Sequence, residues 1–308
     1  MGRYILLRIA SAIPVTIGVL VAVFFMVRLV PGDPVAIMFE NRGRPNPAQE
    51  EAMRGNLGLD LPLYQQFARF VGDVAHGDLG TSFRSKRPVT DEIMLRLPNT
   101  LKLTITSLVF SVLVGGAVGI FAALRKGTWF DFSSMLAAIA SVSIPSFWLA
   151  LMLMLVFSLR LGWLPVSGTG GWRYLVLPVL TLGLRSSAVF ARITRTTMLD
   201  VLGKDYVRVA RAKGLRERTV VLRHALRTAL IPLVTVLGFE IGGLIGGAVI
   251  VESVFAYPGM GQLAVQALSQ RDFPLIQGIV LITALSYVAA NVMVDIAYCV
   301  LDPRVRLG

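Results

Sequence analysis

Six long apolar runs constrain this chain more than any other feature. They cover about residues 9–30, 100–124, 132–159, 174–198, 228–250 and 275–300. A helix needs about 20 apolar residues to cross the hydrocarbon core of a membrane. Only 16% of the residues are charged, well below the roughly 25% of soluble domains. The sequence therefore predicts an all-α polytopic membrane protein with six transmembrane helices.

The charged residues between these runs predict the orientation of the spans. Residues 199–227 hold eight Lys/Arg and three acids, whereas residues 31–98 hold eight basic and nine acidic residues. Arg125 and Lys126 follow the second run. Because cytoplasmic loops carry the excess of Lys and Arg, we expect both termini in the cytoplasm. The net charge of +12 follows from this bias and does not indicate a nucleic-acid binder.

The same pattern divides the chain into three parts. Residues 1–30 form a retained first span, because no small-residue cleavage site follows the apolar run. Residues 31–98 form an extracytoplasmic segment with short amphipathic helices. One begins at "NPAQ" (46–49), an N-terminal capping pattern. A second carries apolar residues on one face: Leu63, Phe67, Phe70, Val71 and Val74. Residues 99–308 form a five-helix core.

The sequence carries no catalytic or nucleotide-binding motif. The phosphate-binding pattern GxxxxGK[ST] is absent, as are HExxH and GxSxG. Cys299 is the single cysteine, and His76 and His224 lie far apart in the sequence. We therefore expect no enzyme activity, no cofactor and no metal ion on this chain.

A basic segment at about residues 203–222 interrupts the apolar chain. Residues 206–213 are rich in helix formers, Gly214 breaks the run, and a second helical pattern begins near Glu217. Pro232 predicts a bend early in the fifth span. A topogenic loop near anionic head groups would explain the charge but not the length. The helix–glycine–helix pattern favours docking to a cytoplasmic partner.

Five stretches of the sequence resemble one known family of membrane proteins. "DYVRVARAKGL" (205–215) resembles the coupling-helix motif of ABC importer permeases, in the version of the dipeptide/oligopeptide permease family. Four more stretches resemble that family in order: "VPGDP" (30–34), "HGDLGTS" (76–82), "VESVFAYPGMG" (251–261) and "NVMVDIAYCVLDPRVR" (291–306). The pattern is similar to the first of the family's two permease subunits. Of the general Glu-Ala-Ala motif, only Ala210 and Gly214 match.

The resemblance implies a type I ABC importer (MetI-like) transmembrane domain in the bacterial cytoplasmic membrane. It implies a second permease, two ATPase subunits that bind ATP and Mg²⁺, and an extracytoplasmic substrate-binding protein as partners, with membrane lipid around the spans. It implies transport of dipeptides or oligopeptides. It also implies that the basic segment couples to an ATPase through Tyr206, Arg208, Ala210, Arg211, Lys213, Gly214, Leu215 and Arg216.

Two groups of residues inside the predicted spans are further candidates. Gly238, Gly242 and Gly246 have the small-xxx-small spacing that lets helices approach closely. Arg185 and Glu240 lie near the middle of their spans, where ionisable groups are costly, so they pair or line the translocation path. Asp295, nearer a span end, is expected to be a structural anchor.

The residues leave alternatives open. A nickel chelate, glutathione or haem would suit the same importer class. An ion-driven secondary transporter would require inverted repeats, and no such repeat is visible in the sequence. A non-transporting scaffold would not need the basic segment.

Overall fold

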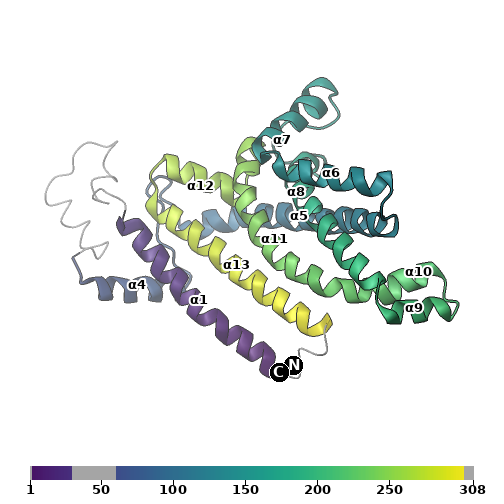
Figure 1. Cartoon of the computed structure of the whole chain (residues 1–308). Helices are drawn as coiled ribbons and strands as arrows, with labels where there is room; N and C mark the ends of the chain where they lie inside the picture. Colours follow the sequence, from purple (N-terminus) through teal and green to yellow (C-terminus); the bar gives the residue numbers. More distant parts are fainter. Residues whose placement is uncertain (1, 30–59, 302–308) are drawn as a thin grey trace. The chain divides into compact units, whose positions relative to one another are not determined.

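The computed structural model describes the backbone of residues 2–29 and 60–301, and the side chains of residues 6–29 and 60–296. The predicted features at 30–34, 46–49 and 302–306, and the side chain of Cys299, lie outside these residues. The described part of the chain is helical (Figure 1), in this order: α1 (Gly2–Leu29), α4 (Leu63–Ala75), α5 (Val89–Leu124), α6 (Trp129–Ser143), α7 (Ser146–Leu153), η1 (Met154–Arg160), α8 (Arg173–Leu202), α9 (Asp205–Ala212), α10 (Glu217–Thr219), η2 (Val220–Ala225), α11 (Leu226–Val254), α12 (Met260–Ser269) and α13 (Phe273–Leu301).

Five of the six expected spans are present as continuous helices. Five helices of the described residues are long and apolar enough to cross a membrane, and a bent pair of helices supplies a sixth candidate. The fold class predicted from the sequence is therefore confirmed.

The third span differs from its prediction. Residues 132–159 do not form one helix, because the chain bends by 106° between α6 and the helical segment Ser146–Arg160. Ile144, between the two helices, has φ −79° and ψ 125°. The residue before a proline is pushed out of the helical region by the proline ring, and Pro145 also has no N–H for a helical hydrogen bond. Pro232, in contrast, lies inside a continuous α11.

The described residues form two compact units, each considered by itself. One unit contains residues 99–262 together with 1–8 and 289–308. In this unit α8 packs against α6 and α11 (Figure 1). Its core joins α8 and α11 through Leu177, Leu182 and Leu244. Arg8 and Asp295 form an ion pair of 3.4 Å in the same unit, as expected for an anchoring role of Asp295.

The second unit contains residues 9–98 and 263–288. The helix predicted from the apolar face at 63–74 is present as α4. Phe67 and Phe70 of α4 contact the ring of Phe24 in α1, with ring centroids 5.2 and 5.9 Å apart. The amphipathic face therefore packs on the first span.

A buried aspartate joins two distant segments of this second unit. Asp272, 1% exposed, accepts hydrogen bonds from the Ser82 hydroxyl at 2.5 Å and from the backbone N–H groups of Phe83 and Arg84. These contacts hold the end of the "HGDLGTS" stretch and the two residues after it. The sequence alone did not reveal a role for this stretch.

Candidate functional site

The candidate docking site is built on the basic segment, in which α9 has two distinct faces. Val207 and Ala210 are buried, and they join Met198, Val201 and Val221 in one apolar cluster with α8 and η2. Ala210 therefore contacts its own chain, and its small side chain lets α9 lie close to that cluster.

Other side chains of α9, beside the buried pair, are open to solvent. Tyr206 is 41% exposed and Val209 is 53% exposed, and Lys213 continues the same face at helical spacing. Leu215, 40% exposed, follows the glycine turn. We call Tyr206, Val209, Lys213 and Leu215 the outer face. It exposes the aromatic ring of Tyr206, and aromatic side chains are enriched on surfaces that meet a protein partner.

Gly214 ends α9 in the left-handed conformation, with φ +76°. Its N–H donates to the Arg211 carbonyl at 2.9 Å, and the Leu215 N–H donates to the Ala210 carbonyl at 3.4 Å. This pair of bonds is the Schellman arrangement that closes many helices, for which glycine is preferred. The sharp turn predicted at Gly214 is therefore present.

Two ion pairs order the basic side chains of this segment. Arg211 bridges the turn to Glu217 at 2.7 Å, and Arg208 pairs with Asp205 at 3.0 Å. The hydrogen bonds that Arg211 donates to the Glu217 carboxylate raise the pKa of the Arg211 guanidinium. Within the part of the chain that the structure describes, Lys213 and Arg216 have no ion-pair partner. These two cations remain available to a second molecule.

The two charged residues predicted inside the spans are not brought together. Arg185 is exposed and Glu240 is half-buried. Over the described residues, neither side chain forms an ion pair. Both remain candidates for lining the translocation path.

The glycines of α11 have different surroundings. A Cβ atom at Gly238 would lie 3.3 Å from Val294 in α13, so this glycine permits a close helix contact. Gly246 faces open space, as does Gly243. Gly242 is half-buried. Gly238, the first of the three glycines, therefore packs against another helix of this chain, whereas Gly246, the last, faces open space.

Sequence reasoning missed a buried ion pair between α6 and α8. The Arg195 guanidinium donates two hydrogen bonds to the Asp131 carboxylate, at 2.5 and 2.7 Å. Asp131 is 5% exposed and also accepts from the Gly127 N–H at 3.0 Å. The partners lie 64 residues apart, so no local pattern indicates them.

Breaking this pair is expected to destabilise the protein. Arg195→Met leaves the Asp131 carboxylate buried without its charged partner, which costs about 3 kcal/mol of unfolding free energy. The double variant Asp131→Leu/Arg195→Met removes both charges, so we expect it to recover most of that loss. Thermal unfolding in detergent, followed by tryptophan fluorescence, measures the difference. A double variant no more stable than Arg195→Met would contradict this account.

A second missed feature explains the stretch "VESVFAYPGMG". Glu252 is fully buried. Its carboxylate accepts hydrogen bonds from the Thr100 hydroxyl at 2.6 Å and from the Gly261 and Gln262 N–H groups at 2.7 and 3.2 Å. Thr100 in turn accepts from the Met260 N–H. The carboxylate therefore satisfies the free N–H groups at the start of α12. We call Glu252, Thr100 and the start of α12 the Glu252 cluster.

The two glycines of this stretch are required by the same contacts. A Cβ atom at Gly259 would lie 2.1 Å from a Glu252 oxygen, and one at Gly261 would lie 2.4 Å from the Val249 Cα. Burial raises the pKa of the neighbouring Tyr257, and the charge of Glu252 adds to this.

Comparison with known proteins identifies the family. Residues 115–307 match the binding-protein-dependent transport system inner membrane component, and residues 1–104 match the N-terminal part of the same kind of membrane component. The chain is 45% identical over 307 residues to the glutathione transport system permease proteins of Escherichia coli (strain K12) and Salmonella paratyphi A. The comparison covers 99% of this chain and 99% of each relative.

Solved structures show the same fold. A methionine ABC transporter in an inward-facing conformation aligns with a TM-score of 0.58 at 18% identity, over 68% of this chain and 96% of that one. An amino acid ABC transporter aligns with a TM-score of 0.52 at 20% identity, over 68% and 94%. With six candidate spans, a MetI-like fold and relatives that match along nearly the whole chain, this protein belongs to the inner-membrane permease components of binding-protein-dependent ABC importers.

Proposed function

We propose that the chain forms, with a second permease, the translocation path of an ATP-driven importer for small peptides, including glutathione. The observation that carries the substrate class is the 45% identity to glutathione permeases along 99% of both chains. Dipeptides and longer peptides share the amine and carboxylate of glutathione, so all belong to one chemical class. Nickel chelates and haem are the remaining candidates.

The proposed topology places both termini and the basic segment in the cytoplasm, because the eight Lys/Arg of residues 199–227 mark a cytoplasmic loop. Residues 31–98 then lie outside, where a substrate-binding protein would deliver its cargo. On the cytoplasmic side, the outer face of α9 docks on one of two ATPase subunits. ATP and Mg²⁺ bind to those subunits.

The geometry of α9 supports this coupling role. A helix that transmits movement needs a rigid seat, which the buried Val207 and Ala210 provide. It also needs a free face for its partner, which Val209 and the unpaired Lys213 provide. The Schellman turn at Gly214 and the Arg211–Glu217 pair hold the segment in shape.

Uptake by the reconstituted importer tests the substrate class. The complex is placed in proteoliposomes with its cognate binding protein, and labelled glutathione, alanyl-alanine and a nickel–histidine chelate are compared. We expect ATP-dependent uptake of glutathione or the dipeptide in preference to the chelate. ATP-dependent uptake of the chelate alone would contradict the proposed substrate class and leave the importer assignment intact.

A further inference from the structure

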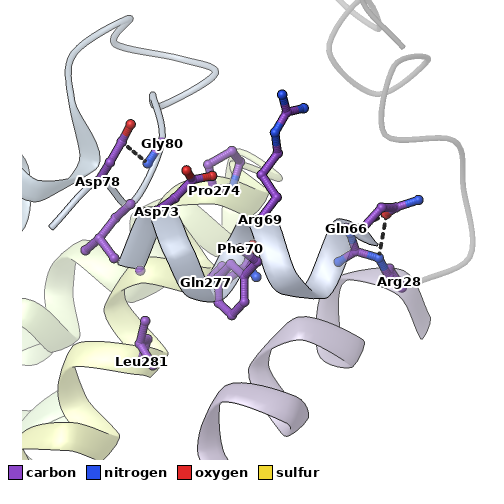
Figure 2. Close-up of a pocket in the computed structure, with 12 residues that line it drawn as sticks. Arg28, Gln66, Arg69, Phe70, Asp73, Asp78, Gly80, Pro274, Gln277 and Leu281 are labelled. Atoms are coloured by element: carbon purple, nitrogen blue, oxygen red, sulfur yellow. Dashed lines mark hydrogen bonds between the residues drawn. The ribbon is translucent and has the colours of Figure 1, made fainter. Parts of the chain in front are cut away.

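The described residues line a cavity that has no role in the proposed docking of α9 on an ATPase subunit. It has a volume of about 230 Å³ and lies in the unit that contains α1, α4 and the start of α13. Figure 2 shows side chains from these three helices and from the loop at 78–80 around it. The volume is below the roughly 300–1,000 Å³ of sites that enclose a drug-sized ligand. The cavity is therefore large enough for a very small ligand, or for one end of a larger ligand.

The ionisable groups of the lining have balanced charges. Arg28 and Arg69 contribute two positive charges, and Asp73 and Asp78 contribute two negative charges. Two carboxylates beside two guanidinium groups disfavour a bare metal cation, which takes more oxygen ligands. The aspartates likewise disfavour a bare anion. A ligand with one positive and one negative group matches this lining.

Some of these polar groups are already engaged and others are free. Arg28 donates to Gln66 at 2.6 Å and lies over the ring of Phe24. Asp78 accepts from the Gly80 N–H at 2.8 Å. The side chains of Arg69, Asp73 and Gln277 make no hydrogen bond or ion pair within residues 6–29 and 60–296. In Figure 2 the dashed lines mark the hydrogen bonds of Arg28 with Gln66 and of Gly80 with Asp78. Arg69 extends from α4, and no dashed line reaches it.

Arg69 and Asp73 are one helical turn apart on α4, a spacing that places side chains about 5–6 Å apart at their Cβ atoms. They form no ion pair with each other in the described structure. A free guanidinium and a free carboxylate at this spacing can bind the carboxylate and the ammonium group of one zwitterion.

The cavity is also held in a fixed shape. Asp272 binds the loop after Asp78 through Ser82, Phe83 and Arg84. Gly278 is one of the lining residues, and a Cβ atom there would lie 2.5 Å from Val89, so α13 approaches α5 closely. A preformed site loses less entropy on binding than one that must be ordered by its ligand.

We infer that this cavity is a binding subsite for the zwitterion of a small peptide, with Arg69 on the terminal carboxylate, Asp73 and Asp78 on the terminal ammonium group, and Gln277 on the peptide amide. The inference rests on the proposed peptide substrate and on the extracytoplasmic position of α4. Such a subsite would hold cargo on the permease itself, apart from the binding protein.

Cysteine protection tests the subsite without transport. In the assembled complex, without ATP or binding protein, Cys299→Ser removes the native thiol and Gln277→Cys places one in the cavity. Ala68→Cys, on α4 but outside the lining, is the control reporter; Pro274→Cys is a second reporter inside it. Labelling by N-ethylmaleimide is followed by mass spectrometry. We expect alanyl-alanine to slow labelling at Gln277→Cys and not at Ala68→Cys, and N-acetyl-alanyl-alanine amide to have no effect.

Charge variants test the assigned roles. Arg69→Gln or Asp73→Asn removes one charge-assisted hydrogen bond, so the half-protecting dipeptide concentration is expected to rise about tenfold. Arg87→Gln and Asp91→Asn, exposed and outside the lining, are expected to leave it unchanged.

Two results would overturn the inference: no protection at either cavity reporter, or equal protection by the blocked peptide. If peptides are imported but no protection is seen, only the subsite fails. If protection is seen without peptide import, the proposed substrate fails and the subsite stands.

Discussion

Glu252→Ala is expected to lower the free energy of unfolding by about 4 kcal/mol, because it leaves several buried donors without an acceptor. The donors are the Thr100 hydroxyl and the Gly261 and Gln262 N–H groups. The start of α12 also loses a negative charge at its positive end. Glu252→Gln keeps the shape and one acceptor oxygen, so we expect a smaller loss.

Thermal unfolding of the purified protein in detergent measures this effect. Glu240→Ala is the matched control, because Glu240 also lies in α11 and, among the described residues, makes no ion pair. We expect that control to change the unfolding free energy by less than about 0.5 kcal/mol. Equal unfolding temperatures for Glu252→Ala and Glu240→Ala would show that the Glu252 cluster does not stabilise the fold.

The second large effect is expected at the outer face of α9. Val209→Asp adds a charge where an apolar side chain would be covered by the ATPase. The loss of a central interface contact costs about 2 kcal/mol, or roughly 30-fold in affinity. Because Val209 is 53% exposed in the permease, we expect the isolated chain to keep its unfolding temperature. Assembly with the ATPase subunit, measured by co-purification over a concentration series, reports the effect.

Two comparisons separate docking from general damage. Val209→Leu keeps the apolar contact and is expected to assemble normally. Gly214→Pro cannot adopt the φ of +76° found at this position, so it should uncouple ATP hydrolysis from uptake while the spans remain folded. If Val209→Asp assembles as tightly as Val209→Leu, the outer face is not the docking surface.

The features that could be predicted from the sequence are those with a local signature. Hydropathy gave the spans because each is a continuous run of apolar residues. The turn at Gly214 could be predicted because a helix-forming run ends at a glycine. The apolar face of α4 has helical spacing, which made that helix predictable without any partner.

The features that were missed depend on contacts between distant residues or on backbone geometry that hydropathy does not detect. Asp131 and Arg195 are 64 residues apart, and Glu252 and Thr100 are 152 apart. The break at Pro145 could not be predicted, because a proline alone does not show that a helix breaks. Pro98 and Pro178, for example, lie inside continuous helices. The sequence places Ala210 in the basic segment, but only the structure shows that its side chain is buried against the same chain.

Site-directed cross-linking in the assembled importer shows whether α9 docks on the ATPase subunit. In the Cys299→Ser background, a benzophenone maleimide probe is attached at Val209→Cys, with Ala68→Cys on α4 as the control. We expect a light-dependent adduct with the ATPase subunit from Val209→Cys and none from Ala68→Cys. An ATPase adduct from both positions, or from neither, would contradict docking through α9.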